Sequence, residues 1–368
     1  MSPPFENHLR KIDELITIED KDRKPYTNIY NKIRDTLLNG MCKVDSPFRQ
    51  MYKGYRLCGS YMHNVRLKKP NEFDVIFILS IPNGDKLAIL KDKNRPGFVK
   101  LGLGDIFPQL TVEMKLILNE LVTGSERLLV RTALQTWLCR TIRNVLKGIE
   151  NRIQTDGRYL QLTYLKTGVA HTIYARDVKN PHFSISIDFI PAITIKKVFK
   201  FGNESDIHSL YAVPKPFKGK YINGSGNSFQ LVNPDMEHKL LMGKQHLKVV
   251  YRLLKSLRDR HRLDRLKSVF FTSMFLWEIE KRSQNFWHKP IGEVFLEMLK
   301  VLKERFQTRN FPYFWSPEHN LVDILTDDEM TDYAEILNTI FCTFQAYPNQ
   351  QSLTFDMCAR HFQILRKC

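Results

Sequence analysis

Two acidic residues at the start of an apolar strand constrain this sequence more than any other feature. The segment Phe73-Asp-Val-Ile-Phe-Ile-Leu79 is rich in β-branched and aromatic residues, which favours a β-strand. Side chains alternate between the faces of a strand, so Glu72 and Asp74 share one face and the apolar residues take the other. Adjacent carboxylates repel each other unless a cation lies between them. Because hard oxygen ligands suit Mg²⁺ or Mn²⁺, the pair predicts a divalent metal site.

A third carboxylate lies far along the chain, in a second strand-like segment over residues 182–190. There Ile185, Ile187 and Phe189 form an apolar face, and Asp188 lies on the other face. If this strand pairs with the first, three acids converge on two metal ions. Such ions, about 3.5–4 Å apart, activate an attacking hydroxyl and stabilise a leaving pyrophosphate.

The dipeptide Gly59-Ser60 precedes the acidic pair and predicts a phosphate contact. A glycine lets the backbone approach a phosphate closely, and a serine hydroxyl with adjacent amides can hold a triphosphate. The dipeptide is weak evidence alone, since Gly124-Ser125 and Gly224-Ser225 also occur. The dipeptide becomes stronger evidence because it precedes the paired acids and then the distant strand acid along the chain.

Hydrophobic periodicity divides the chain into a mixed α/β half, residues 1–205, and a helical half, residues 206–368. We expect a long helix over residues 5–38, kinked or broken at Pro25 and stopped near Gly40. A loop is expected at residues 219–227. The remaining expected strands are residues 87–90, 97–103 and 159–165, and the remaining expected helices are residues 126–149, 234–255, 263–281, 290–306 and 327–344.

Composition excludes several classes of protein. Hydrophobic residues make up 43% and charged residues 26%, which is globular composition. The start of the sequence has no secretory-signal pattern, and no apolar run approaches the ~20 residues that a membrane span needs. The six cysteines include no C-x-x-C pair, so we expect reduced thiols, a cytosolic or nuclear protein, and no zinc ribbon.

The net charge of +17 predicts a polyanionic partner. Residues 231–270 contain ten basic side chains but only four acidic ones. A duplex backbone is bound by such a surface, and A-form RNA is recognised mainly through its shape, phosphates and 2′-hydroxyls. The candidate nucleic-acid-binding residues are three at helical spacing in this region, Lys244, Arg252 and Lys255, and four in the N-terminal helix, Arg10, Lys11, Lys32 and Arg34.

The ordered set of a Gly-Ser dipeptide, a Glu-x-Asp strand and a distant strand acid resembles the nucleotidyltransferase signature. The string over residues 59–79 is similar to the cyclic GMP–AMP synthase and Mab-21 family, and closest to its insect double-stranded-RNA-sensing members, the cGAS-like receptors. The similarity covers roughly residues 50–345, with looser matches over residues 186–188, 210–215, 229–237, 246–254 and 264–277.

The resemblance implies a fold and an activity. The fold would be α+β and bilobal: an N-terminal spine helix, a mixed β-sheet catalytic lobe of the nucleotidyltransferase fold, and a helical C-terminal lobe. The activity would be synthesis of a cyclic dinucleotide, of cyclic GMP–AMP type, from ATP and GTP. Double-stranded RNA would activate it, and a STING-like receptor would read the product in innate antiviral signalling.

The resemblance also assigns site residues. Glu72, Asp74 and Asp188 match the catalytic acids that hold two Mg²⁺ or Mn²⁺ ions. The candidate nucleotide-binding residues are Gly59, Ser60, Asp188, Glu237, Lys248 and Ser268.

The chain departs from the family pattern at several positions. Vertebrate DNA sensors carry a zinc thumb between the positions that match Glu237 and His246, but this interval is short here and has no cysteine. We therefore expect no zinc and an RNA activator. Tyr251 stands where a nucleotide-contacting lysine is usual, and Val269 or Phe270 where a base-stacking tyrosine is usual. Two alternatives stay open: a linear oligoadenylate-type synthase, and a catalytically silent Mab-21-like protein that binds nucleic acid.

Overall fold

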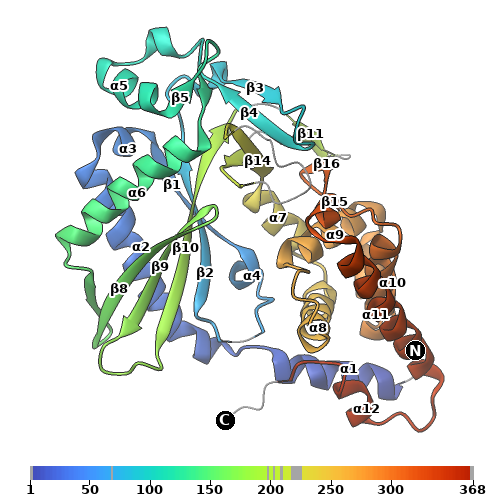
Figure 1. The fold of residues 1–368 in the computed structure, drawn as a ribbon. Helices are drawn as coiled ribbons and strands as arrows, with labels where there is room; N and C mark the ends of the chain where they lie inside the picture. The colour runs from blue at the N-terminus through green and yellow to red at the C-terminus, as the bar shows by residue number, and fades with distance from the viewer. Residues whose placement is uncertain are drawn as a thin grey trace. The chain divides into compact units, whose positions relative to one another are not determined.

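The computed structural model describes residues 3–67, 69–196, 199–201, 204–207, 210–216 and 226–364. The chain divides into two compact units (Figure 1). Unit 1 comprises Met1–Glu19, Gly59–Pro70 and Asp235–Cys368, and unit 2 comprises Asp20–Cys58 and Asn71–Pro234. Most of the loop expected at residues 219–227 lies outside the described residues. Among the described helices, none combines the length and apolar character of a membrane span.

In the described part of unit 2, a mixed sheet of twelve strands forms the centre (Figure 1). The strands β2 (Glu72–Leu79) and β10 (Ser184–Ile195) run parallel to each other, and β1 (Tyr52–Cys58) pairs antiparallel with β2. On one side of β10 lie β9 (Ala170–Asp177), β8 (Arg158–Thr167) and β7 (Arg152–Thr155). On the other side lie β13 (Leu210–Val213), β14 (Ser228–Val232), β4 (Phe98–Gly102), β3 (Ala88–Lys91), β6 (Leu128–Leu129) and β5 (Val122–Thr123). A separate pair is formed by β11 (Phe199–Phe201) and β12 (Glu204–Ile207).

Helices cover one face of this sheet because that face is apolar. Phe73 of β2 is buried, and the ring of Tyr30 in α2 (Asp20–Val44) stacks on it at 4.4 Å. Asp45 joins two further helices: one carboxylate oxygen caps α3 (Ser46–Met51), and the other accepts bonds of 2.8 Å from Trp137 and Thr141 of α6 (Arg131–Gly148). The unit also contains α5 (Val112–Leu121).

The long N-terminal helix is interrupted at a place that the sequence did not predict. It forms α1 (Pro3–Ile16) and α2, with the interruption at residues 17–19, while Pro25 and Gly40 both lie inside α2. Pro25 costs only one backbone hydrogen bond close to the start of the helix. A Cβ atom at Gly40 would lie 2.5 Å from Cγ1 of Val145, so this glycine lets α2 and α6 approach closely. The expected break at Pro25 and stop at Gly40 are therefore wrong.

Unit 1 is mainly helical. Besides α1 it contains α4 (Gly59–Met62), α7 (Pro234–Leu241), α8 (Leu247–Arg260), α9 (Ser268–Lys281), α10 (Ile291–Gln307), α11 (Asp327–Ala346), α12 (Phe355–Ala359) and the hairpin β15 (Pro312–Tyr313)–β16 (Ser316–Asn320). Trp287, Phe275 and Phe295 are fully buried in its core. The helix expected over residues 234–255 is interrupted between α7 and α8.

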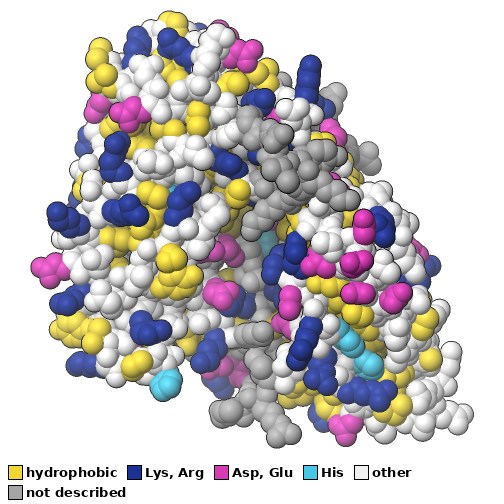
Figure 2. Space-filling model, viewed as in Figure 1, with side chains coloured by type: hydrophobic (Ala, Val, Ile, Leu, Met, Phe, Trp, Pro, Cys, Tyr) yellow, Lys and Arg dark blue, Asp and Glu magenta, His cyan; other side chains and the backbone are white. Residues whose placement is uncertain are grey.

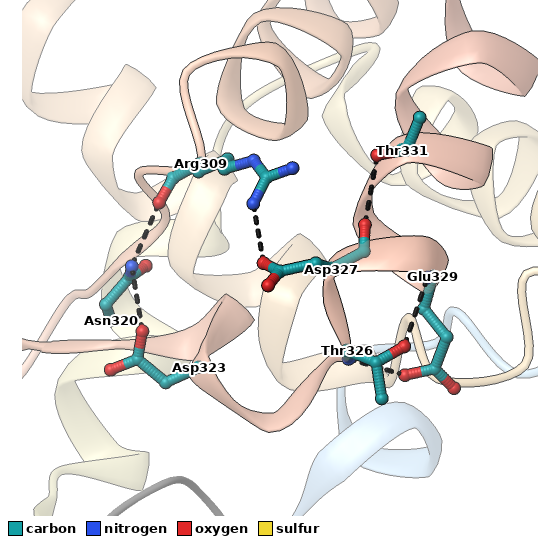
Figure 3. A network of polar contacts seen from close by, with 7 residues as sticks. All are labelled: Arg309, Asn320, Asp323, Thr326, Asp327, Glu329 and Thr331. Carbon is teal, nitrogen blue, oxygen red and sulfur yellow. Dashed lines mark hydrogen bonds and ion pairs between the residues drawn. The ribbon is translucent and has the colours of Figure 1, made fainter.

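A network of polar contacts fixes the start of α11 (Figure 3). The hydroxyl of Thr326 accepts a hydrogen bond from the backbone N–H of Glu329, and the Glu329 carboxylate accepts one from the N–H of Thr326. Arg309 forms an ion pair of 2.6 Å with Asp327. The start of the helix expected over residues 327–344 is confirmed, and this arrangement at its first turn is a capping box.

The structure confirms the expected α+β class, with a mixed sheet and a helical C-terminal region. The compact units nevertheless divide the chain differently from a boundary at residue 205. Strands β13 and β14 follow that residue, yet they belong to unit 2 because they pair with each other, with β10 and with β4. The segments 1–19 and 59–70 belong to unit 1.

Candidate functional site

The register of the two parallel strands brings the predicted acids to one face of the sheet. Asp188 lies beside Asp74, and Ser186 lies beside Glu72. Residues paired on neighbouring strands point to the same face, as do residues two apart on one strand. Glu72, Asp74 and Asp188 therefore share the face opposite to the buried Phe73.

Asp188 is held by a neighbouring strand and repelled by a neighbouring acid. The hydroxyl of Thr172 in β9 donates a hydrogen bond of 2.7 Å to Oδ1 of Asp188. Burial raises the pKa of Asp188, the bond from Thr172 lowers it, and the charge of Glu72 raises it again, with a net increase. The effect of Glu72 shows that the two carboxylates are close enough to repel each other. A divalent cation would remove this repulsion.

The donor chemistry fits a hard divalent cation, because all three side chains are carboxylates. Within the described ranges, however, no group of three or more His, Cys, Asp or Glu side chains is gathered closely enough to hold a metal ion. The backbone register supplies the common face, so closing the acids around an ion requires movement of side chains. Glu72, Asp74 and Asp188 are the residues that would hold it.

Gly59 and Ser60 form a tight turn directly after β1. Gly59 has φ of 69°, in the left-handed region that favours glycine, and it begins the short helix α4. Its carbonyl accepts a hydrogen bond from the N–H of His63, and the Ser60 carbonyl accepts one from Val65. Both residues belong to unit 1, whereas the three acids belong to unit 2.

Glu237 lies in the first turn of α7, among polar and aromatic side chains of unit 1. The indole Nε1 of Trp315 donates a hydrogen bond of 2.7 Å to Oε1 of Glu237. Nε2 of His63 lies 3.9 Å from the second carboxylate oxygen, Oε2. Burial raises the pKa of Glu237 to about 7, although the bond from Trp315 lowers it.

The other candidate nucleotide contacts of unit 1 lie on α8 and α9. Lys248 is half-buried, and its Nζ lies 3.6 Å from the sulfur of Met242. Ser268 begins α9, and its carbonyl accepts a hydrogen bond of 3.0 Å from the hydroxyl of Tyr251. Tyr251 and Phe270, which occupy two of the departed positions, are buried core residues. Their side chains are therefore used for packing.

Three of the candidate nucleic-acid-binding side chains are buried. Arg252 binds Asp13 through two hydrogen bonds, of 2.7 and 2.6 Å, and Nζ of Lys255 donates to the carbonyl of Val65 at 2.9 Å. In unit 2, Arg34 bonds to Asp35 and Asn31 and lies over the ring of Tyr55 at 4.1 Å. Arg10, Lys11 and Lys32 are exposed, and Lys244 is half-buried.

Sequence reasoning missed three side chains that contact the candidate residues. Thr172 carried no signal, because only its pairing with β10 brings it to Asp188. Trp315 is a buried aromatic residue whose N–H also holds Glu237. His63 lies four residues after Gly59, so its position close to the phosphate-binding dipeptide could have drawn attention to it.

Comparison with known proteins identifies two consecutive domains. Residues 61–243 match the Mab-21 protein nucleotidyltransferase domain, and residues 246–339 match the Mab-21 protein HhH/H2TH-like domain. The chain is 31% identical over 331 residues to cyclic GMP-AMP synthase-like receptor 1 of Drosophila erecta, covering 86% of this chain and 72% of that protein. It is 30% identical over 324 residues to cyclic GMP-AMP synthase-like receptor 1 of Drosophila melanogaster, covering 84% of each. A cyclic GMP-AMP synthase-like receptor of Aethina tumida is 29% identical over 346 residues, covering 89% of this chain and 84% of that protein.

Proposed function

Because the chain belongs to the Mab-21 nucleotidyltransferase family, and within it to the cyclic GMP–AMP synthase-like receptors, we propose that it joins ATP and GTP into a cyclic dinucleotide of cyclic GMP–AMP type. Double-stranded RNA is the proposed activator, and a STING-like receptor in the same cell is the proposed reader of the product. The observation that carries the proposal is the register that sets Asp188 beside Asp74 on the face that also bears Glu72.

The three acids have the central catalytic role in this proposal. Glu72, Asp74 and Asp188 would hold two Mg²⁺ or Mn²⁺ ions, and bound ions would activate an attacking hydroxyl and neutralise the leaving pyrophosphate. Asp188 lies nearest the attacking ribose hydroxyl and is the proposed acceptor of its proton. Thr172 orients Asp188 by holding Oδ1.

Residues of unit 1 are the proposed nucleotide contacts. The left-handed turn at Gly59 exposes backbone for close approach to phosphate, and the Ser60 hydroxyl donates to it. Glu237, Lys248 and Ser268 contact the nucleotides as hydrogen-bonding or charged groups. Lys248 supplies positive charge for phosphate.

The exposed basic side chains of unit 1 are the proposed RNA surface. Arg10 and Lys11 on α1 are exposed, as are Arg260, Arg262 and Lys267 near the end of α8 and the start of α9. Figure 2 shows Lys and Arg side chains gathered on the part of unit 1 that carries α1 and α12. A phosphate backbone needs such charges and no base-reading groups. Arg252, Lys255 and Arg34 are left out of this surface because they are buried.

A reconstitution with the purified chain tests the function. The chain is incubated with Mg²⁺ or Mn²⁺, with ATP alone or ATP plus GTP, and with duplex RNA or duplex DNA, and products are identified by mass and nuclease sensitivity. We expect a cyclic product only with both nucleotides and RNA. A linear product from ATP alone would favour an oligoadenylate-type synthase, and no product under any condition would favour a silent nucleic-acid-binding protein.

The double variant Glu72→Ala/Asp74→Ala tests the assigned acids. We expect loss of product with RNA binding nearly unchanged. The matched control is Asp85→Ala, which removes an exposed acid of the same unit and should retain activity. Product formation by the double variant would contradict the assignment.

A further inference from the structure

The polar cluster around Glu237 contains a histidine for which the assigned site residues give no role. His63 is only 4% exposed, and its Nε2 lies 3.9 Å from Oε2 of Glu237. Its other ring nitrogen, Nδ1, is buried and has no hydrogen-bond partner in the described part of the chain. An N–H···O hydrogen bond is usually ~2.9 Å long, so a shift of about 1 Å would join His63 to Glu237.

Glu237 is held by one hydrogen bond and is not fully buried. Trp315 donates to Oε1 at 2.7 Å, His63 faces Oε2, and 18% of the side chain is exposed. The carboxyl group accepts hydrogen bonds when ionised, and it can also donate one when protonated.

The groups around the pair favour a neutral histidine. Burial, together with the nearby charges of His238, Lys248 and Lys255, lowers the pKa of His63 to about 4. The ring of His238 lies 6.2 Å from that of His63 and nearly parallel to it. Tyr251 and Tyr313, whose pKa values are raised by burial and by the charge of Glu237, complete the titratable surroundings. Near neutral pH, therefore, Glu237 is the member of the pair that gains or loses a proton.

We propose that His63 is a positioning residue that shares a proton with Glu237, so that this carboxyl can change from acceptor to donor. In the ionised state, Nε2–H of His63 donates to Oε2. When Glu237 takes a proton from solvent, its O–H donates to Nε2, and the imidazole proton lies on Nδ1. The consequence for nucleotide binding rests on the proposed function, because it requires Glu237 to contact a nucleotide.

A nucleotide-free titration tests the pair itself. The histidine NMR signals of the full chain are followed from pH 5.5 to 8.5. We expect the His63 signals to shift with a midpoint near pH 7 in the unmodified chain and to lose that midpoint in Glu237→Gln. The exposed His288, which contacts Gln245, is the control whose titration should be the same in both. A His63 signal that does not respond near pH 7, or responds equally in Glu237→Gln, would overturn the proposal.

Trp315→Phe adds a test with a defined direction. The indole bond lowers the pKa of Glu237, so its loss should move the midpoint to higher pH. A midpoint that stays or falls would contradict the arrangement. Kinetics provide the functional readout: for His63→Leu we expect the nucleotide KM to rise at least threefold, with kcat within twofold. His63→Gln, which keeps a donor toward Oε2, should restore KM.

The two kinds of failure can be distinguished. If the chain makes no nucleotide product but His63 reports a midpoint near pH 7, the proposed function fails and the proton-sharing pair stands. If product forms normally while His63→Leu keeps the unmodified KM at every pH, the pair has no role in nucleotide binding and the inference fails.

Discussion

Replacing Arg252 by alanine should destabilise the protein strongly. The guanidinium of Arg252 on α8 makes two hydrogen bonds to Asp13 of α1, of 2.7 and 2.6 Å, and a third of 3.0 Å to the carbonyl of Asn64. The two side chains are only 9% and 13% exposed. All three residues belong to unit 1, so the side chain ties three separate segments of that unit together.

The size of the effect follows from burial. In Arg252→Ala, the carboxylate of Asp13 stays largely buried and loses its countercharge, and removing one partner of such a pair costs about 3–5 kcal/mol. Whole domains are stable by only about 5–15 kcal/mol, so this is a large fraction of the total. The double variant Asp13→Ala/Arg252→Ala removes both charges and should lose clearly less than the sum of the two single changes.

Urea unfolding at pH 7, followed by tryptophan fluorescence, measures the loss. The matched control is Lys267→Ala, an exposed basic residue of the same unit, which should change the unfolding free energy by no more than about 0.5 kcal/mol. If Arg252→Ala costs less than about 1 kcal/mol, the buried pair does not stabilise unit 1 substantially. If it instead weakens RNA binding without destabilising the chain, Arg252 is a nucleic-acid contact after all.

Three other predictions concern catalysis, pH and salt. Thr172→Val removes the hydrogen bond that orients Asp188, so kcat should fall about tenfold or more. The control Thr163→Val changes an exposed site on β8 and should leave kcat unchanged. Equal kcat values for the two variants would exclude the orienting role. Because folding raises the pKa of Glu237 from 4.5 to about 7, the unfolded chain ionises first, and the free energy of unfolding falls as pH rises through that window. Relative to the unmodified chain, the unfolding free energy of Glu237→Gln in urea should therefore increase by about 3 kcal/mol between pH 4.5 and 7.5. A pH-independent difference would refute this. If six to ten phosphates are contacted, RNA affinity measured by fluorescence anisotropy should fall about 10³–10⁵-fold between 50 and 200 mM salt, and a salt-insensitive affinity would exclude the basic surface.

Local sequence pattern determined the elements and their faces. The alternation around Glu72 and Asp74 and around Asp188 predicted which face of each strand the acids occupy, and the strands formed there. Most helices of unit 1 were also predicted, because helix and strand periods involve residues close together in the chain.

Only the tertiary structure decided which distant residues meet. The parallel register of β2 and β10 aligned Asp188 with Asp74, and packing within unit 1 turned Arg252 inward to Asp13 and set His63 beside Glu237. A basic residue at helical spacing has the same local signature whether it faces solvent or a buried carboxylate. The difference depends on free energies of burial and pairing between segments far apart in the chain, which no local period encodes.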